Sequence, residues 1–131
     1  VGVALTLVAA GARVEQVREN GTSPLAIASQ TGYTDIVLLL HSQGADVNRR
    51  ALSARSTPLF GAAHANARTV DALLSVGAEL NAVVDDGTTP LASAALSGHA
   101  DTVTALLRHD ADVELFDRSR FTPLMCATQN K

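Results

Sequence analysis

One short pattern is repeated four times along the chain, and it limits the fold more than any other feature. The stretch GTSPLAIA at residues 21–28 returns as STPLFGA at 56–62, as GTTPLASA at 87–94 and as FTPLMCA at 121–127. A second pattern, a Gly-Ala pair that is once Asp-Ala, begins at positions 11, 44, 77 and 110, so its spacing is 33 each time. Two markers with one shared period indicate a repeat protein.

Each copy of the pattern predicts a pair of short helices. The Ser or Thr before each proline can accept a hydrogen bond from an unpaired backbone N–H, and proline fits the first helical position because its missing N–H is not needed there. In the first complete copy, the apolar residues 25–28 predict a helix that Gly32 ends in the left-handed conformation. Residues 36–40 have helical spacing and predict a second helix that ends at Gly44. We therefore expect an all-α fold of stacked helix pairs.

Composition limits the classes of function. The net charge of −3 argues against a general nucleic-acid binder or a binder of anionic membranes. Nine of the ten basic residues are arginines, whose planar guanidinium groups suit contacts with a partner's carboxylates. The single cysteine, Cys126, allows no internal disulfide and fits a reducing, intracellular setting, cytoplasmic or nuclear. The apolar run at residues 1–12 is too short to cross a bilayer and lacks the basic start of a signal peptide.

The combined pattern closely resembles the ankyrin repeat. It reads Gly-x-Thr-Pro-Leu-x-x-Ala, then Gly, a Val/Leu helix and Gly-Ala-Asp-Val-Asn, and residues 21–48 are its clearest copy. The resemblance covers nearly the whole chain and implies antiparallel helix pairs whose linking turns project as β-hairpin fingers. We expect a single array over residues 1–131, as a piece of a longer protein. Its parts are the end of a repeat (1–16), three full repeats (17–49, 50–82 and 83–115) and the start of a further repeat (116–131).

Three positions depart from the family pattern where it usually has glycine. Arg55 and Arg120 stand at finger tips, and because positive φ is uncommon for residues other than glycine, we expect these two fingers to be remodelled. The finger before Thr57 is also one residue longer than the others. Asp110 stands where the other repeats have the glycine of the Gly-Ala pair, so we expect it to be strained.

The sequence predicts no catalysis, cofactor or metal site. It contains no Gly-x-Ser-x-Gly elbow, no phosphate-binding Gly-Lys-Ser/Thr and no His-Glu-x-x-His. The four histidines fall at unrelated places in the repeats, and His99 stands where the family often has a structural histidine. The pair Asp85-Asp86 is interpreted as solvated finger-tip charge, and Cys126 as a small buried hydrophobic residue. We expect no enzyme and no small-molecule substrate.

The resemblance implies that a partner protein or peptide binds the concave face formed by the fingers and the first helix of each repeat. Carried over position by position, that face comprises Glu19, Asn20, Thr22, Gln30, Thr31, Arg50, Ser53, Arg55, Ser56, His64, Val83, Asp85, Asp86, Thr88, Leu96, Ser97, Phe116, Arg118, Ser119 and Phe121.

Two groups of residues distinguish this face from a generic surface. Arg49, Arg50 and Arg55 gather in the longer finger and predict binding of an acidic segment or a phosphate, with a solvated run of charge as the alternative. An apolar group predicts anchors for a partner, with contact to the rest of the fifth repeat as the alternative for Phe121. The apolar group comprises Val83, Leu96, Phe116 and Phe121. The expected partner is therefore partly acidic and partly apolar.

Several alternatives remain open at this point. The array could instead be a spacer or an intramolecular docking platform for a neighbouring catalytic domain, or the arginines could contact nucleic acid, against which the acidic balance weighs. Leu5 and Leu38 either form an exposed ridge on the outer helices or are buried. Asn48 resembles the asparagines that ankyrin-repeat proteins offer to an oxygen-dependent hydroxylase. Its other interpretation is a structural residue whose side chain bonds nearby backbone.

Overall fold

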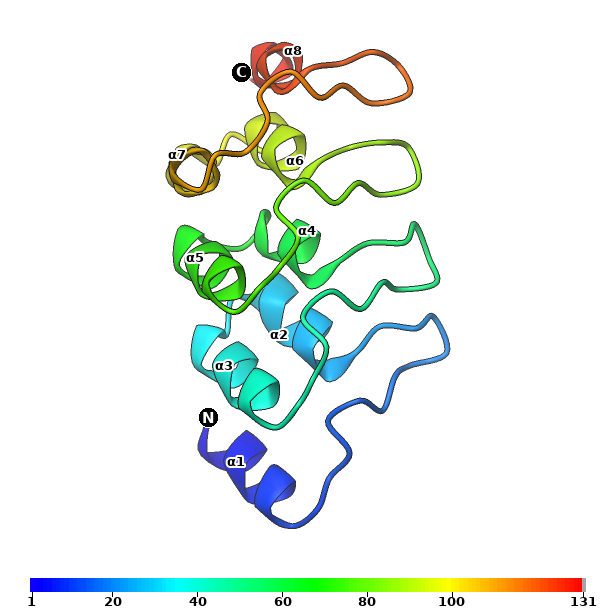
Figure 1. The fold of residues 1–131 in the computed structure, drawn as a ribbon, viewed down its shortest axis with the longest axis vertical. Coiled ribbons are helices and arrows are strands. Elements are labelled where there is room, and N and C mark those ends of the chain that lie inside the picture. Colours follow the sequence, from blue (N-terminus) through cyan, green and yellow to red (C-terminus); the bar gives the residue numbers. More distant parts are fainter. Residues whose placement is uncertain (131) are drawn as a thin grey trace.

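The computed structural model describes residues 1–130 as an elongated stack of helix pairs, with the two ends of the chain at opposite ends of the stack (Figure 1). The expected all-α fold is confirmed. No β-strand forms among these residues, so the fingers are loops rather than paired strands. The helices are α1 (Gly2–Ala9), α2 (Pro24–Thr31), α3 (Thr34–Ser42), α4 (Pro58–Ala62), α5 (Ala67–Ser75), α6 (Pro90–Leu96), α7 (Ala100–Arg108) and α8 (Pro123–Gln129).

The helices form two layers. The first helices of successive repeats pack on one another, α2 on α4, α4 on α6 and α6 on α8, and α3, α5 and α7 stack in the same way in the second layer. The largest fully buried side chains lie between the two layers. They include Leu25, Val37, Leu59, Val70, Leu73 and Leu106. Each repeat therefore buries its apolar face against its neighbours, as repeat arrays do.

The predicted helix starts are confirmed in all four copies of the repeated pattern. Ser23 accepts a hydrogen bond from the Ala26 backbone N–H at 3.1 Å, and proline follows it at the first helical position. The hydroxyls of Thr57, Thr89 and Thr122 cap α4, α6 and α8 in the same way. Each of the four short helices thus begins directly after the capping hydroxyl group that the sequence predicts.

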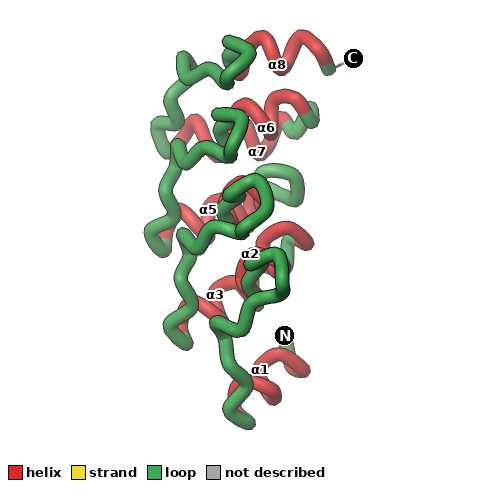
Figure 2. Tube along the Cα trace, turned by 90° about the vertical axis from the view of Figure 1, so that its right-hand side faces the viewer, coloured by secondary structure: helices red, strands yellow, loops and turns green. Residues whose placement is uncertain are grey.

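The fingers are the four loops before α2, α4, α6 and α8, at residues 17–23, 50–57, 83–89 and 116–122. They project from one side of the stack and lie above one another (Figures 1 and 2). Each finger is closed by one backbone hydrogen bond. The bonds run from Arg18 N–H to Thr22 O, Ala51 N–H to Ser56 O, Val84 N–H to Thr88 O and Asp117 N–H to Phe121 O, at 3.0, 3.0, 3.1 and 3.1 Å.

Backbone hydrogen bonds also join each finger to the one before it. They run from Leu52 N–H to Asn20 O at 2.8 Å, from Asp85 N–H to Ala54 O at 3.0 Å and from Arg118 N–H to Asp86 O at 2.8 Å. Because these bonds fix each fingertip relative to the next, the four fingers form a continuous surface.

The longer finger is remodelled, as expected, but the fourth is not. Ala54 and Arg55 have φ values of 55° and 50°, so two consecutive residues in the left-handed region accommodate the extra residue. Arg120, with φ 65°, donates its N–H to Asp117 O, the same tip bond that Gly21 and Gly87 make in their fingers. The expectation of remodelling is therefore wrong for the fourth finger, where arginine occupies the geometry that glycine has elsewhere.

Asp110 has the left-handed backbone that the sequence predicts, with φ 64°. The glycines at the equivalent place, Gly11, Gly44 and Gly77, have φ values of 91°, 91° and 98°.

We expect Asp110→Gly to raise the free energy of unfolding by about 0.5–1 kcal/mol because glycine removes the left-handed strain. Thermal unfolding measures this. Asp110→Ala, which removes the charge but keeps the β-carbon, is the control and should bring no such gain; a melting temperature unchanged or lowered in the glycine variant would contradict the explanation.

Leu5 and Leu38 are among the exposed leucines of the outer helices. Leu5 on α1 and Leu38 on α3 are 51% and 38% exposed, so the exposed interpretation of this pair is the correct one. Asp71 stands at the equivalent place on α5.

Candidate functional site

The finger face consists of the fingers together with the solvent-facing sides of α2, α4 and α6. None of the residues that the sequence assigned to this face is fully buried. Half-buried are Thr22, Arg50, Ser56, Thr88, Ser97 and Phe121. Exposed are Glu19, Asn20, Gln30, Thr31, Ser53, Arg55, His64, Val83, Asp85, Asp86, Leu96, Phe116, Arg118 and Ser119.

One prominent residue of this face was not predicted from the sequence. Leu52, in the second finger, is 75% exposed. It follows the residue that closes its finger, as Glu19, Asp85 and Arg118 do in theirs. Each of these four residues lies eight positions after the first residue of the preceding Gly-Ala or Asp-Ala pair. The repeat spacing could therefore have identified Leu52.

Arg49 is separated from the other two members of the expected arginine group by its own ion pair. Arg49 is paired with Glu15, its Nη1 lying 2.9 Å from Oε2. Arg50 instead reaches the next finger, because its Nη1 donates to Arg55 O at 2.9 Å and to Val83 O at 2.7 Å. Arg118, from the fourth finger, joins Arg50 and Arg55 around one hollow of about 460 Å³. Three fingers therefore build the basic site that the sequence assigned to one.

The outer helices pair their charges across repeats. Arg68 on α5 lies 3.1 Å from Asp35 on α3, and Arg108 on α7 lies 3.1 Å from Asp71 on α5. His109 also contacts the Asp71 carboxylate at 3.1 Å. The charges of this surface are therefore largely matched within the molecule.

The arginines of the fingers lack such partners. Within residues 1–130, none of the five finger arginines forms an ion pair, and these are Arg18, Arg50, Arg55, Arg118 and Arg120. Arg120 instead lies over the ring of Phe116, with its Cζ 4.5 Å from the ring centroid. The fingers thus carry basic groups that remain available to an external acidic group.

Two carboxylates of the fingers are occupied by their own loops. Asp86 Oδ1 accepts from the Thr88 N–H at 2.9 Å, and Asp117 Oδ1 accepts from Ser119 and Phe121 at 2.8 and 2.9 Å. Hydrogen bonds from Thr88, helped by the charge of Arg118, lower the pKa of Asp86. Asp86 and Asp117 thus stabilise their own fingertips, and both Asp85 and Asp86 are exposed to solvent. Among residues 1–130, no three His, Cys, Asp or Glu side chains gather in an arrangement that could hold a metal ion.

The apolar anchors expected from the sequence are divided between two environments. Val83, Leu96 and Phe116 are 40%, 48% and 51% exposed. Phe121 is half-buried and packs against the small cluster of Ala92, Ala95 and Cys126, so it is less available to a partner than the other three. Cys126 is buried, as expected, and its burial, together with the nearby Asp117 charge, raises the pKa of its thiol.

His64 joins two repeats at the centre of the finger face. Its Nε2 lies 2.6 Å from Ser93 Oγ and its Nδ1 lies 3.1 Å from Ser97 Oγ, both of the next repeat. Its ring meets Phe60 edge-on, with 5.6 Å between the ring centroids. Partial burial of the ring lowers the pKa of His64, and the positive charge of His99 adds to this effect.

The lowered pKa of His64 predicts a loss of stability in acid. At neutral pH both the folded and unfolded states hold a neutral imidazole, but as the pH falls through about 6.5 the unfolded state takes up the proton first. The free energy of unfolding therefore decreases as the pH falls from about 6.5 to the lower pKa that His64 has in the folded state. Below that pKa this group causes no further loss. Urea unfolding of wild type and His64→Gln from about pH 7.5 to 5 should show the wild type losing more stability than the variant. Parallel curves would show that His64 titrates alike in both states.

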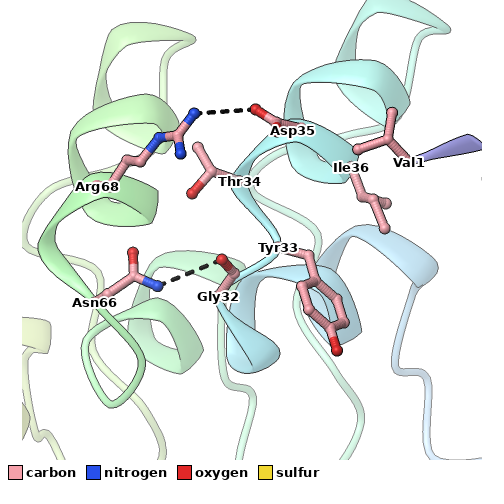
Figure 3. A pocket seen from close by; sticks show the side chains of 8 residues that line it. All are labelled: Val1, Gly32, Tyr33, Thr34, Asp35, Ile36, Asn66 and Arg68. Atoms are coloured by element: carbon pink, nitrogen blue, oxygen red, sulfur yellow. Dashed lines mark hydrogen bonds and ion pairs between the residues drawn. The ribbon is translucent and has the colours of Figure 1, made fainter.

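A second hollow, of about 480 Å³, lies on the other side of the stack between α3 and α5 (Figure 3). Its polar groups already bind one another: Asn66 Nδ2 donates to Gly32 O at 3.3 Å, and Arg68 pairs with Asp35. This hollow is therefore a weaker candidate for a ligand site than the one between the fingers.

Asn48 holds two repeats together. Its Nδ2 donates to Gly77 O at 3.0 Å, and its Oδ1 accepts from the Glu79 N–H at 2.8 Å. Both amide groups thus bind backbone of the following repeat, which supports the structural interpretation. Hydroxylation of Asn48 stays a prediction. His99 is also structural in its contacts, since its Nδ1 lies 3.4 Å from Ala63 O of the preceding repeat.

Comparison with known proteins agrees with this architecture. A family model described as ankyrin repeats, three copies, matches residues 59–131, and a single ankyrin-repeat model matches residues 20–52. The chain is 40% identical over 116 residues, 84% of its length, to an ankyrin repeat protein of fowlpox virus. It is 35% identical over 112 residues to the B-cell lymphoma 3 protein homolog of Mus musculus, and 36% identical over 107 residues to the ankyrin repeat and SOCS box protein 16 of Homo sapiens.

The matches to these relatives cover 84%, 85% and 81% of this chain but only 34%, 25% and 23% of the relatives themselves. What the similarity carries over is therefore the repeat array. Among residues 1–130, no helix combines the length and the apolar character that crossing a membrane requires. Ankyrin repeats are in general non-catalytic modules for protein–protein interaction. The family models together match most of the chain, and the chain belongs to the ankyrin-repeat family.

Proposed function

We propose that this array binds an extended segment of a partner protein along the finger face. The observation that carries the proposal is the contrast between the two sides of the stack. The outer helices match their charges across repeats, whereas the finger arginines form no ion pair within residues 1–130. Basic groups held on a fixed surface and left without acidic partners fit an acidic segment of another protein.

The exposed apolar side chains support the same face. Leu52, Val83 and Phe116 lie in the second, third and fourth fingers, and Leu96 lies on α6 behind them. An aromatic ring next to arginine is a frequent centre of binding energy in protein interfaces, and Phe116 has Arg120 against its ring. The proposed partner segment is therefore partly acidic and partly apolar.

Affinity capture from cell lysate with matched variants tests the proposal. The finger-face variant carries Arg55→Glu, Arg118→Glu and Phe116→Ser, and the outer-face variant carries Arg68→Glu, Arg108→Glu and Leu38→Ser. Circular dichroism first establishes that both fold. We expect proteins that bind the wild type and the outer-face variant but not the finger-face variant. Loss only in the outer-face variant would move the binding surface to the outer helices, and capture unchanged in both would favour the spacer or docking-platform alternative.

A further inference from the structure

The hollow between the second, third and fourth fingers gathers three arginines of the described chain. Arg50 and Arg55 of the second finger and Arg118 of the fourth line it, together with Val83 and Asp85 of the third finger. It encloses about 460 Å³, enough for a side chain rather than a folded element. Three consecutive repeats thus contribute to one site.

Hydrogen bonds to backbone carbonyls fix the Arg50 side chain and the main chain of Arg118 beside this hollow before any ligand arrives. Arg50 donates its Nη1 to Arg55 O at 2.9 Å and to Val83 O at 2.7 Å, so its guanidinium group spans two fingers. The main chain of Arg118 is tied to the third finger through its N–H bond to Asp86 O at 2.8 Å. Such preorganisation lowers the conformational entropy lost on binding.

The charge around the hollow is positive on balance, because its arginines outnumber the neighbouring carboxylates. Three arginines face a single carboxylate, that of Asp85, and among residues 1–130 neither Arg55, Arg118 nor Asp85 forms an ion pair. The neighbouring Asp86 accepts the Thr88 N–H of its own finger and keeps its negative charge, which also interacts with Arg118. A ligand with one negative charge therefore matches this site, while Asp85 opposes a denser charge such as that of a phosphate.

We propose that this hollow binds the carboxylate of one Asp or Glu side chain in the partner segment, next to an apolar residue that contacts Val83 and Phe116. The inference rests on the proposed function and specifies its chemistry. Arg55 and Arg118 supply the guanidinium contacts, since their planar donors match the two oxygens of a carboxylate. Arg50, already bonded to the carbonyl oxygens of Arg55 and Val83, holds the second finger against the third.

Selection from a phage-displayed library of random peptides about twelve residues long, with the chain immobilised, tests this inference without a known partner. We expect selected sequences to be enriched in Asp or Glu beside an apolar residue. The same selection on Arg55→Gln with Arg118→Gln should lose the acidic enrichment and keep the apolar one. Selection on Arg68→Gln with Arg108→Gln, a matched pair from the outer helices, should keep both.

Synthetic peptides from the selection then give the size of the effect. We expect Arg55→Gln with Arg118→Gln to weaken binding of an acidic peptide about 10- to 100-fold, and replacement of the peptide's acid by its amide to do the same. Asp85→Asn should tighten binding about threefold, since it removes a like charge. The outer-face pair should change the affinity less than about twofold.

The outcomes separate the inference from the function on which it rests. Peptides selected without acidic residues, or acidic peptides that both arginine pairs weaken equally, would overturn the carboxylate site and leave the finger face as a binding surface. If no peptide is selected, the proposed function fails and the inference with it. Tighter binding of a single-stranded oligothymidylate than of any acidic peptide, with the same dependence on Arg55 and Arg118, would assign the hollow to nucleic acid.

Discussion

Leu73→Ala is expected to lower the free energy of unfolding by about 3 kcal/mol, within the 2–5 kcal/mol range for a fully buried leucine. Leu73 lies on α5 and is 0% exposed. Because α5 packs against both α3 and α7, the cavity left by the substitution opens at the centre of the stack. Urea unfolding followed by circular dichroism measures the loss.

The exposed Leu52 provides the matched control for this substitution. Leu52→Ala removes the same atoms from a side chain that is 75% exposed, so we expect a change of less than about 0.5 kcal/mol. The two variants also separate stability from function, since only Leu52 lies on the finger face. Equal destabilisation by both substitutions would show that the fingers contribute as much to folding as the helix layers do.

The central position of Leu73 leads to a second expectation for the same experiment. In a linear array each repeat is stabilised mainly by its two neighbours. Weakening the middle of the stack therefore uncouples its two halves, and the urea dependence of unfolding should become shallower than in the wild type. A parallel shift with an unchanged slope would show that the repeats still unfold as one unit.

The helix pairs were predictable because their signals are local. A capping hydroxyl, the proline after it and the closing glycine lie within a few residues of one another, and the structure places the four helix caps at Ser23, Thr57, Thr89 and Thr122 as expected. The period of 33 residues then determined which elements stack. The left-handed backbone of Asp110 could be inferred for the same reason, since the repeat aligned it with three glycines.

The site was only partly predictable because its contacts join different repeats. Arg49, Arg50 and Arg55 are close in sequence, but Arg49 is paired with Glu15 from the repeat before it. Arg118 reaches the same hollow from a finger about two periods away. Which arginines converge depends on side-chain paths between fingers, and the periodic pattern does not contain that information.

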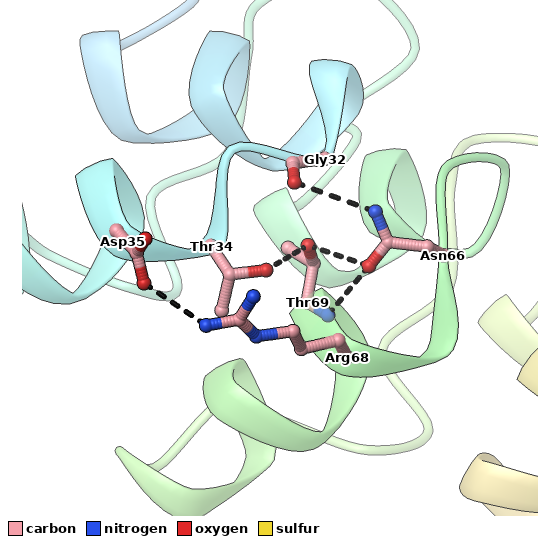
Figure 4. A network of polar contacts seen from close by, with 6 residues as sticks. All are labelled: Gly32, Thr34, Asp35, Asn66, Arg68 and Thr69. Carbon is pink, nitrogen blue, oxygen red and sulfur yellow. Dashed lines mark hydrogen bonds and ion pairs between the residues drawn. The ribbon is translucent and has the colours of Figure 1, made fainter. Parts of the chain in front are cut away.

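A network of polar groups between α3 and α5 shows the same limit and gives the second prediction. Asn66 caps α5, because its Oδ1 accepts from the Thr69 N–H at 2.8 Å and from the Thr69 hydroxyl at 2.9 Å. The Thr69 hydroxyl also bonds the buried Thr34 hydroxyl of the preceding repeat at 2.8 Å. Asn66 Nδ2 in turn donates to Gly32 O (Figure 4). One side chain therefore joins a helix cap to an interface between repeats.

Asn66→Ala should lower the free energy of unfolding by about 2 kcal/mol, of which about 1 kcal/mol is the lost helix cap and the rest the loss of an acceptor for the buried Thr69 hydroxyl. Asn66→Asp keeps the accepting oxygen, but it loses the bond to Gly32 O and places a second carboxylate oxygen near that carbonyl. We expect it to cost less than about 1 kcal/mol, because a carboxylate at a helix N-terminus is stabilising. Chemical unfolding at neutral pH measures both variants.

An equal loss in the two variants would assign the stabilisation to the bond with Gly32 rather than to the cap.

The equivalent positions in the neighbouring repeats explain why this network is particular to one interface. Tyr33 and His99 stand where Asn66 does, and neither caps its helix through a side-chain hydrogen bond. The apolar packing of each helix layer therefore repeats from one repeat to the next, whereas the polar contacts differ. We expect equivalent core substitutions to change the free energy of unfolding by similar amounts in each repeat, and substitutions at the polar contacts between repeats to have effects that differ from repeat to repeat.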